Sequence, residues 1–226
     1  MTATSTKPIF SAAPALPRGP HQLTREQVAS SQRDRLLAAF TELLAQRGFS
    51  AVKIGELAQR AGVSRATFYE HFADKQACLL AAYDHFASTL LAAMTANLDT
   101  DAPWSEFIDT TLSSYLGTLE RDPIAARAFF VEMEAAGTVA RQRRRQAVHA
   151  FAALLSHRHD AIRESDPSLG PLPEAVWLAV ALAVRELVRE ALEDGPTPKL
   201  TQLAPNVQIL VAALINGAAS SSDGLA

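Results

Sequence analysis

Apolar residues recur at intervals of three and four along most of the chain, and this spacing limits the possible folds more than any other feature. Two such series are Leu36, Leu37, Phe40, Leu43 and Leu44, and Leu79, Tyr83, Phe86, Leu90 and Met94. These intervals place side chains on one face of an α-helix. No run of β-branched residues alternates with polar residues as a strand would. The sequence therefore predicts an all-α fold of about nine helices without a sheet.

Capping residues set the expected ends of the helices. Thr24 and Gln27 form a capping box at the start of the first helix, and Gly48 is expected to end that helix. Asp74 is expected to open a long helix toward Asn97, and Asp122-Pro123 to open a shorter one that Gly137 ends. Further helices are expected to begin at Pro103 and to cover 138–165, 173–195 and 206–216.

The segment from Lys53 to Phe72 holds two short helical patterns separated by a glycine. One face of the first pattern is apolar and is formed by Ile54, Leu57, Ala58 and Ala61. Gly62 can adopt the positive φ that a tight turn between crossed helices needs, and Ser64 can cap the second helix. Phe68 and Phe72 are four residues apart, so both are expected to point into the core. The pattern predicts a helix-turn-helix whose second helix exposes its outer face.

That outer face carries groups that can contact DNA. Arg65 can donate two hydrogen bonds to guanine O6 and N7, and Ala66 and the Thr67 methyl group can contact a thymine methyl group. The hydroxyl groups of Ser64, Thr67 and Tyr69 can donate to phosphate, and Lys75 adds a positive charge. His71 is expected to face outward with them.

The charge distribution supports a polyanionic partner for the N-terminal part. The net charge of −3 alone would argue against nucleic-acid binding. Residues 1–80, however, contain 10 Lys and Arg against 6 Asp and Glu, whereas residues 81–226 contain 11 against 18. This asymmetry indicates a basic module followed by an acidic module with another task.

The pattern Leu57-Ala-x-x-Ala-Gly-Val-Ser-Arg-Ala-Thr-Phe-Tyr-x-His-Phe-x-x-Lys75 resembles the tetracycline-repressor (TetR) family of bacterial regulators, with a match over about 35–82. The resemblance implies an all-α homodimer with a small N-terminal DNA-binding domain and a larger ligand-binding domain. It also implies that the residues from Arg65 to Thr67 contact bases and that Tyr69, His71 and Lys75 contact the DNA backbone. Lys53 departs from the family pattern, which has Ser or Thr there. A lysine cannot cap the helix, although its ammonium can still reach phosphate.

Composition and this pattern predict four regions. Residues 1–22 contain four prolines among small residues and are expected to form a disordered arm. Residues 23–74 form the predicted DNA-binding domain and residues 75–217 the regulatory and dimerisation domain, followed by a frayed tail at 218–226.

The last two predicted helices are apolar almost all round. The first, within 174–194, is apolar as far as Arg185, and the second, 207–215, has only Gln208 as a polar residue. A helix of this kind must be covered on both sides. We therefore expect a homodimer through the two C-terminal helices, within 174–216. The alternative is a pair of helices buried inside one protomer.

Inward aromatic and apolar side chains of the second region can line a cavity for a small apolar ligand, which the negative charge predicts to be neutral or cationic. The candidates are Phe86, Leu90, Phe107, Thr111, Tyr115, Phe129, Met133 and Trp177. The alternative is that these residues only fill the core. His157 and His159 lie about 200° apart on a helix, so they cannot chelate a metal together, and both are expected at the surface.

The sequence predicts a cytoplasmic regulator, nucleoid-associated when bound to DNA, rather than an enzyme. No H-E-x-x-H, P-loop or dinucleotide fingerprint is present, so neither a cofactor nor a metal is expected. Cys78 is the single cysteine, which excludes an internal disulfide. The longest apolar run, 175–184, is too short to span a membrane. The expected function is a repressor that binds a palindromic operator as a homodimer and is released by a small hydrophobic ligand. The alternative is a DNA-binding protein of the same fold without a ligand.

Overall fold

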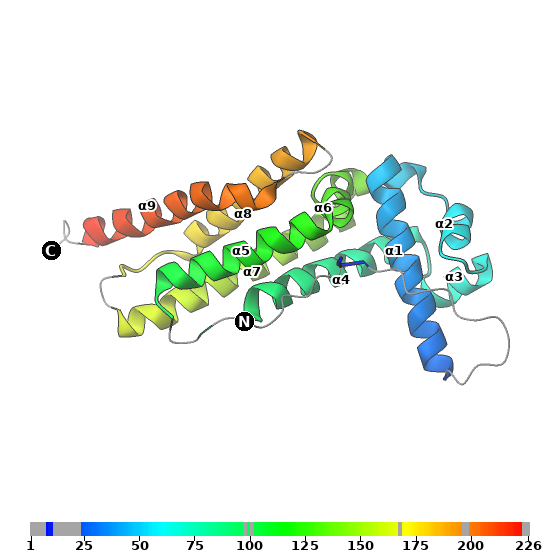
Figure 1. The fold of residues 1–226 in the computed structure, drawn as a ribbon, viewed down its shortest axis with the longest axis horizontal. Coiled ribbons are helices and arrows are strands. Elements are labelled where there is room, and N and C mark those ends of the chain that lie inside the picture. The colour runs from blue at the N-terminus through cyan, green and yellow to red at the C-terminus, as the bar shows by residue number, and fades with distance from the viewer. Residues whose placement is uncertain are drawn as a thin grey trace. The chain divides into compact units, whose positions relative to one another are not determined.

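The computed structural model describes residues 8–10, 24–96, 99, 102–166, 169–195 and 199–222. These residues form nine α-helices and two short 3-10 helices and contain no strand, which confirms the all-α prediction (Figure 1). The helices are α1 Arg25–Ala51, α2 Ile54–Arg60, α3 Arg65–His71, α4 Lys75–Thr95, α5 Trp104–Arg121, α6 Pro123–Phe130, η1 Glu132–Ala136, α7 Thr138–Ser165, α8 Glu174–Glu193, η2 Leu200–Leu203 and α9 Ala204–Ser222.

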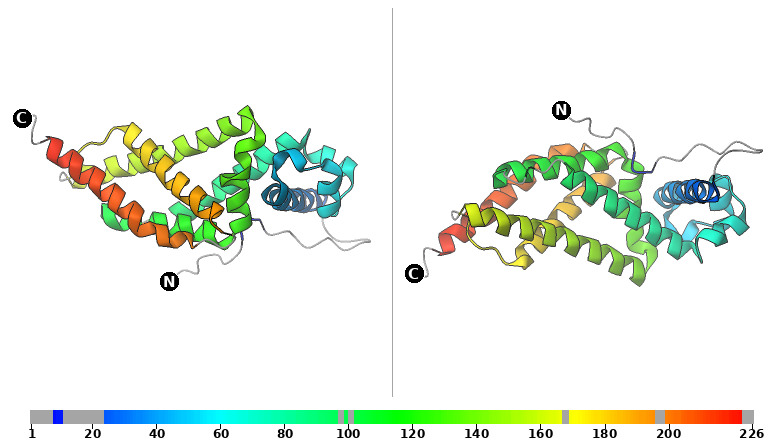
Figure 2. Two further views of the ribbon diagram at one scale, coloured as in Figure 1. Left: turned by 90° about the horizontal axis from the view of Figure 1, so that it is seen from above. Right: turned by 90° about the horizontal axis from the view of Figure 1, so that it is seen from below.

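The chain divides into two compact units. The first unit contains residues 1–89 and 121–141, and the second contains residues 90–120 and 142–226. The first therefore holds α1, α2, α3, α6 and η1 with the first part of α4, because α6 and η1 pack on α1. The second holds almost all of α5, most of α7, and α8, η2 and α9 (Figure 2).

The ends of α1 follow the sequence signals. Thr24 Oγ1 accepts a hydrogen bond from the Gln27 backbone (3.2 Å), and Gln27 Oε1 accepts one from the Thr24 backbone (2.9 Å), so the predicted capping box is confirmed. Gly48 has a φ of 72° and breaks the helix where the sequence predicted its end. A Cβ at Gly48 would lie 3.3 Å from Glu132 Oε2, so the Glu132 side chain would have to shift slightly, and the positive φ is the main reason for glycine there.

The first unit has an aromatic core between α4 and α6. The predicted inner stripe of α4 is confirmed, since Leu79, Tyr83 and Phe86 in the first unit and Leu90 and Met94 in the second are all buried. Within the first unit, the rings of Phe86 and Phe129 lie 4.8 Å apart between centroids. Asp122 caps α6 by accepting a hydrogen bond from the Ala125 backbone (3.0 Å), as predicted.

A short N-terminal segment joins this core, which differs from the disordered arm expected at 1–22. Ile9 is only 8% exposed, and its carbonyl oxygen accepts a hydrogen bond from His85 Nε2 (3.2 Å). The Phe10 backbone donates to Asp122 Oδ2 (3.2 Å), and the Phe10 ring contacts the rings of His85 and Phe129. Two adjacent apolar residues are enough to dock here because α4 and α6 supply matching polar partners. The remainder of 1–22 lies outside the described residues.

The second unit is held together by α7 and by polar contacts to α5. Buried positions on α7 recur at helical spacing and are Ala152, Leu155, His159 and Ile162. The expectation that His159 lies at the surface is therefore wrong, because this residue is 0% exposed, whereas His157 is exposed as expected. Gln208 of α9 donates to Asp109 of α5 (2.7 Å), which gives the polar residue of an apolar helix a partner.

The C-terminal helix is longer than predicted. Its last helical residue is Ser222, so the helix continues beyond Asn216 and through the start of the tail expected to be frayed. Alanines at 218 and 219 favour this extension, since alanine has the highest helix propensity. Residues 223–226 lie outside the described part of the chain.

The surfaces of α8 and α9 expose several apolar side chains. On α8 the exposed positions include Ala175, Ala179 and Leu182, and on α9 they are Pro205, Ile209, Ala212 and Ala213. Ile209 is 69% exposed and Leu182 is 46% exposed. Because these positions recur every three or four residues, each helix has an unpaired apolar stripe in addition to its buried face.

Among the described residues, one helix passes a length and composition test for a membrane span. This helix is α4, which is long and apolar enough to span a membrane but is partly buried. The buried stripe of α4 packs into the protein core, and core helices pass the same test. The test therefore gives only weak support for a membrane span.

Candidate nucleic-acid interface

The turn between α2 and α3 has the geometry that the sequence predicted. Gly62 has a φ of 66°, and the Gly62 and Val63 backbone N–H groups donate to the carbonyl oxygens of Gln59 (3.1 Å) and Ala58 (2.9 Å). Arg35 of α1 lies against the turn, with Nη1 3.5 Å from the Gly62 carbonyl oxygen. These contacts pair backbone groups at the end of α2 and in the turn, and they fix the angle at which α3 begins.

Ser64 caps α3. Its Oγ accepts a hydrogen bond from the Thr67 backbone (2.9 Å), and the two hydroxyl groups lie 3.0 Å apart. The predicted cap is thus present, and both hydroxyl groups are at the exposed start of the helix. Lys53 precedes α2 without any capping bond from its side chain, as its chemistry requires.

The two faces of α3 differ sharply in burial. Phe68 is 0% exposed and Phe72 is 6% exposed, so both point inward as predicted. Arg65, Ala66, Tyr69 and Glu70 are exposed, and Thr67 is half-buried. The face that the sequence assigned to DNA is therefore available to a partner over most of its length.

His71 is half-buried at the end of α3. Its Nε2 donates to Gln32 Oε1 of α1 (3.3 Å). Burial lowers the pKa of His71 below its ordinary value, while the neighbouring Glu70 carboxylate opposes that shift. At neutral pH the ring is therefore uncharged and tied to α1, and a contact with DNA would be a hydrogen bond and not an ion pair.

Lys75 has protein partners for its ammonium group. Nζ lies 2.9 Å from the carbonyl oxygen of Phe49, 3.3 Å from that of Ser50 and 3.2 Å from that of Val52. It also lies 4.5 Å from the centre of the Phe49 ring. These bonds engage all three ammonium hydrogens at the end of α1. The DNA-backbone contact implied for Lys75 stays a prediction, and the structure gives this residue a second role.

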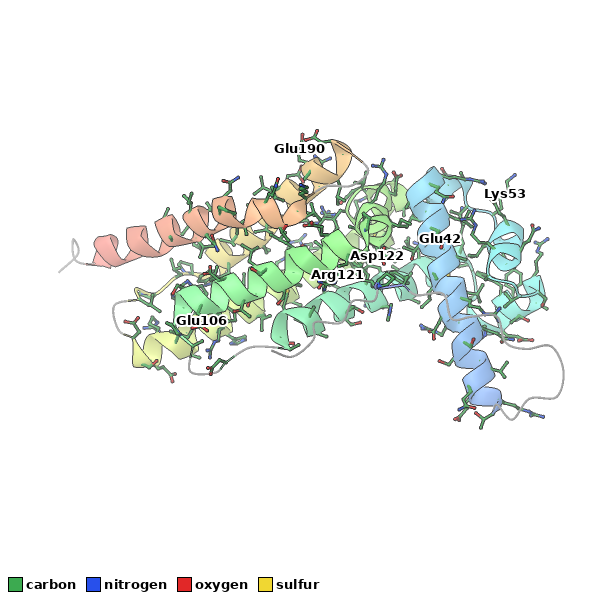
Figure 3. The ribbon with its side chains drawn as sticks, in the orientation of Figure 1. Glu42, Lys53, Glu106, Arg121, Asp122 and Glu190 are labelled. Atoms are coloured by element: carbon green, nitrogen blue, oxygen red, sulfur yellow. The ribbon has the colours of Figure 1, made fainter. Side chains whose placement is uncertain are left out.

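Ion pairs neutralise part of the charge on this unit. Arg47 pairs with Glu56 (2.7 Å), and Arg60 pairs with Glu42 (3.0 Å). Lys53 and Arg65 are exposed and make no ion pair with any described residue. Figure 3 labels Lys53 beside the start of α2, and Glu42 on α1. Lys53 and Arg65 are thus the cations of the helix-turn-helix that remain available to phosphate or bases.

Sequence reasoning missed the contribution of α1 to this interface. Gln32 holds His71, the Arg33 guanidinium carbon lies 5.6 Å from the centre of the Phe72 ring, and Arg35 contacts the turn. A signal was available, since these polar residues directly precede the apolar series that begins at Leu36. Their partners could not be identified, because they lie 27 to 39 positions away in the sequence.

The residues proposed to bind a ligand are all buried, and they fall in both units. Phe86, Phe129 and Met133 belong to the first unit, and Leu90, Phe107, Thr111, Tyr115 and Trp177 belong to the second. In the second unit, Phe107 and Trp177 each contact the ring of Trp104, at 5.3 and 5.2 Å between centroids. Tyr115 instead contacts Phe151. Their role in ligand binding stays a prediction.

Two residues of the second unit were missed as site candidates. Trp104 and His159 are buried and lie 5.2 Å apart between ring centroids. The spacing of His159 from Leu155 and Ile162 placed it on the inner face of α7, and this signal could have corrected its assignment to the surface.

Comparisons with known proteins agree with this architecture. Residues 36–82 match the family described as bacterial regulatory proteins, tetR family. The HTH-type transcriptional activator FasR of Mycolicibacterium smegmatis (strain ATCC 700084 / mc(2)155) is 26% identical over 114 residues, which are 50% of this chain and 52% of FasR. The match thus spans about half the length of that relative.

Solved structures of transcriptional regulators share the fold. FadR from Bacillus subtilis, solved in complex with stearoyl-CoA, has a TM-score of 0.71 and 18% identity, covering 81% of this chain and 97% of FadR. FadR from Bacillus halodurans has a TM-score of 0.70 and 16% identity, covering 79% and 93%. Residues 36–82 therefore match the domain of the tetR family, and the chain that carries this domain shares the fold of these solved structures.

Proposed function

We propose that this protein is a DNA-binding transcriptional regulator that inserts α3 into the major groove of its operator. The difference in burial between the two faces of α3 carries the proposal, because Phe68 is buried while Arg65, Ala66 and Tyr69 are exposed. An exposed arginine can donate two hydrogen bonds to guanine, and small methyl-bearing side chains can contact thymine. Lys53 supplies a positive charge for the phosphate backbone.

The protein acts as a homodimer through α8 and α9. The exposed apolar stripes on these helices support this proposal, since Leu182 and Ile209 would be covered by the same residues of a second copy. A two-fold dimer places two α3 helices in successive major grooves, about 34–36 Å apart. The operator is therefore palindromic.

A small apolar ligand releases the protein from DNA. The buried aromatic side chains of Phe107, Tyr115 and Trp177 in the second unit, and the fold shared with FadR, which was solved with stearoyl-CoA, support this step. A ligand can shift DNA affinity only if it binds more tightly to the conformation that does not bind the operator. DNA must then weaken ligand binding by the same factor.

Regulation by the bound dimer can be repression or activation of transcription. We propose repression, in which the bound dimer blocks transcription until the ligand removes it. Activation is the second candidate, since FasR is named an activator. In vitro transcription from the protein's own operator distinguishes them, because addition of the dimer lowers transcript yield in the first case and raises it in the second.

Selection from random DNA followed by fluorescence anisotropy tests the central proposal. Arg65→Ala is expected to cost about 1–3 kcal/mol and to relax base preference at one or two positions. Arg145→Ala is the matched control, since it removes the same charge from an exposed position on α7 in the second unit. An unchanged base preference for Arg65→Ala, or failure to select any palindrome, would contradict the proposal. A thermal-shift screen for ligands distinguishes it from a regulator without a ligand.

A further inference from the structure

A cluster of aromatic rings lies inside the second unit. Trp104 of α5, His159 of α7 and Trp177 of α8 form a triangle whose ring centroids are 5.1 to 5.2 Å apart. Trp104 is 8% exposed, Trp177 1% and His159 0%, so all three are more than nine-tenths buried. Three helices thus bring nitrogen-bearing rings together in one buried place.

The nitrogens of this cluster lack hydrogen-bond partners. Trp104 Nε1, Trp177 Nε1 and both ring nitrogens of His159 are buried, and no described residue bonds to them. The Asp160 carboxylate is 3.8 Å from His159 Nδ1, which is beyond hydrogen-bond distance. Thr111 Oγ1, two helical turns beyond Trp104 on the same face of α5, is unpaired as well among the described residues.

Packing alone does not account for this arrangement. A buried donor without a partner costs its full desolvation penalty, so native proteins rarely leave one unpaired. Here four unpaired nitrogens belong to three rings that contact one another, so the unpaired groups are concentrated in one place. An N–H group over a neighbouring ring gains only a weak interaction, which does not replace a hydrogen bond.

The chemistry of the unpaired groups determines which ligand groups can form hydrogen bonds with them. An indole N–H only donates, and a neutral imidazole donates with one nitrogen and accepts with the other. Burial lowers the pKa of His159, which keeps its ring neutral at pH 7. Donors therefore outnumber acceptors, so the missing partner must carry acceptor oxygens. A carboxylate would have to bury its charge against neutral donors, which disfavours it relative to a neutral carbonyl group.

We propose that Trp104, His159 and Trp177 form a binding site for a small apolar molecule that carries a neutral carbonyl group, held by the two indole N–H groups. This proposal rests on the ligand-controlled function proposed above and names the chemical class of that ligand. Phe107, 5.3 Å from Trp104, extends the site with an apolar surface for the body of the molecule.

The protein contains two tryptophans, and both belong to this site, so indole N–H signals in an ¹H–¹⁵N NMR spectrum report on it alone. The probes are acetophenone, which carries a carbonyl group, ethylbenzene, which has a methylene in its place, and benzoate, which carries a charge. Trp104→Phe and Trp177→Phe each remove one signal and thereby assign both. We expect acetophenone to move both signals downfield. Ethylbenzene should cause no downfield shift, and benzoate should leave both signals unmoved.

Each phenylalanine variant also removes one donor and keeps a ring. We expect each to weaken acetophenone binding about fivefold, the worth of one neutral hydrogen bond, and to leave ethylbenzene binding unchanged.

Three results would overturn the proposal. The first is an equal shift with acetophenone and ethylbenzene, and the second is no shift with acetophenone up to its solubility limit. The third is a pair of indole signals that lie downfield in the protein alone, show a contact with water and do not respond to acetophenone. The experiment contains no DNA, so failure of operator binding would leave its outcome intact. Acetophenone binding without any effect on operator affinity would support the site and contradict only the proposed release.

Discussion

Lys75 Nζ lies 2.9 Å from the carbonyl oxygen of Phe49, close to the end of α1. Its other two bonds reach the carbonyl oxygens of Ser50 and Val52, so one side chain from α4 satisfies three backbone acceptors. The last carbonyl groups of a helix have no partner within the helix and carry a partial negative charge. Lys75 therefore fastens the start of α4 to the segment that leads from α1 into α2.

Lys75→Met is expected to lower the free energy of unfolding by about 2 kcal/mol, because it leaves these carbonyl groups without a charged donor. Methionine keeps the length and apolar stem of lysine, so the loss reports on the ammonium group. Urea denaturation followed by circular dichroism measures it. If stability stays within about 0.5 kcal/mol of the wild type, the three bonds do not stabilise the fold.

Lys53→Met is the matched control and a prediction in its own right. Lys53 is exposed and makes no capping bond, so its loss should leave stability unchanged. It should weaken binding to all DNA sequences alike and lower the salt dependence of binding by about one phosphate contact. Anisotropy titrations at several salt concentrations measure this slope. An unchanged slope would place Lys53 away from the DNA.

The sequence predicted the parts of the fold that depend on local chemistry. The Thr24 capping box, the Gly62 turn and the Ser64 cap are all present, because each involves groups no more than a few residues apart. The burial of Phe68 followed in the same way from helical periodicity.

Partners distant in the sequence could not be predicted. The bonds from Lys75 to the end of α1 span 23 to 26 positions, and the bond from Phe10 to Asp122 spans 112. The resemblance implied a phosphate contact for Lys75, which stays a prediction, but nothing in the local sequence indicated its bonds to the end of α1. Burial of His159 was likewise not predicted, because a histidine ring can carry a charge and was therefore expected at the surface despite the apolar spacing around it.

Glu70 is an exposed carboxylate on the face of α3 proposed to meet DNA. Glu70→Gln should strengthen DNA binding, because it removes repulsion from phosphate, and the gain should shrink as salt rises. Glu26→Gln, in the first turn of α1, is the control for a general change in net charge. Equal gains for both variants, measured by anisotropy, would show that Glu70 has no special position relative to the DNA.

Phe10→Ala tests whether the N-terminal segment stabilises the first unit. The ring of Phe10 contacts those of His85 and Phe129, and the substitution keeps the backbone bond to Asp122. We expect a loss of about 1–2 kcal/mol from the buried aromatic area. Pro8→Ala, at an exposed neighbouring position, is the control. Identical melting temperatures for the two variants would mean that the segment contributes nothing to stability.

His159 makes the stability of the protein depend on pH. Burial lowers its pKa in the folded state below the ordinary value of 6.5. As pH falls through 6.5, the unfolded chain therefore binds a proton before the folded protein does, and unfolding becomes more favourable. Above that range both states are neutral and the residue contributes no pH dependence. The loss is complete only below the lowered pKa of the folded state.

Urea denaturation at pH 7.5 and 5.5 measures this effect. The free energy of unfolding should fall on acidification in the wild type and fall less in His159→Phe, which has no group to protonate. His71, whose pKa burial also lowers, remains in the variant and keeps part of the dependence. His157→Phe, at an exposed position of the same helix, should behave as the wild type. If His159→Phe loses as much stability as the wild type, protonation of His159 does not couple to unfolding.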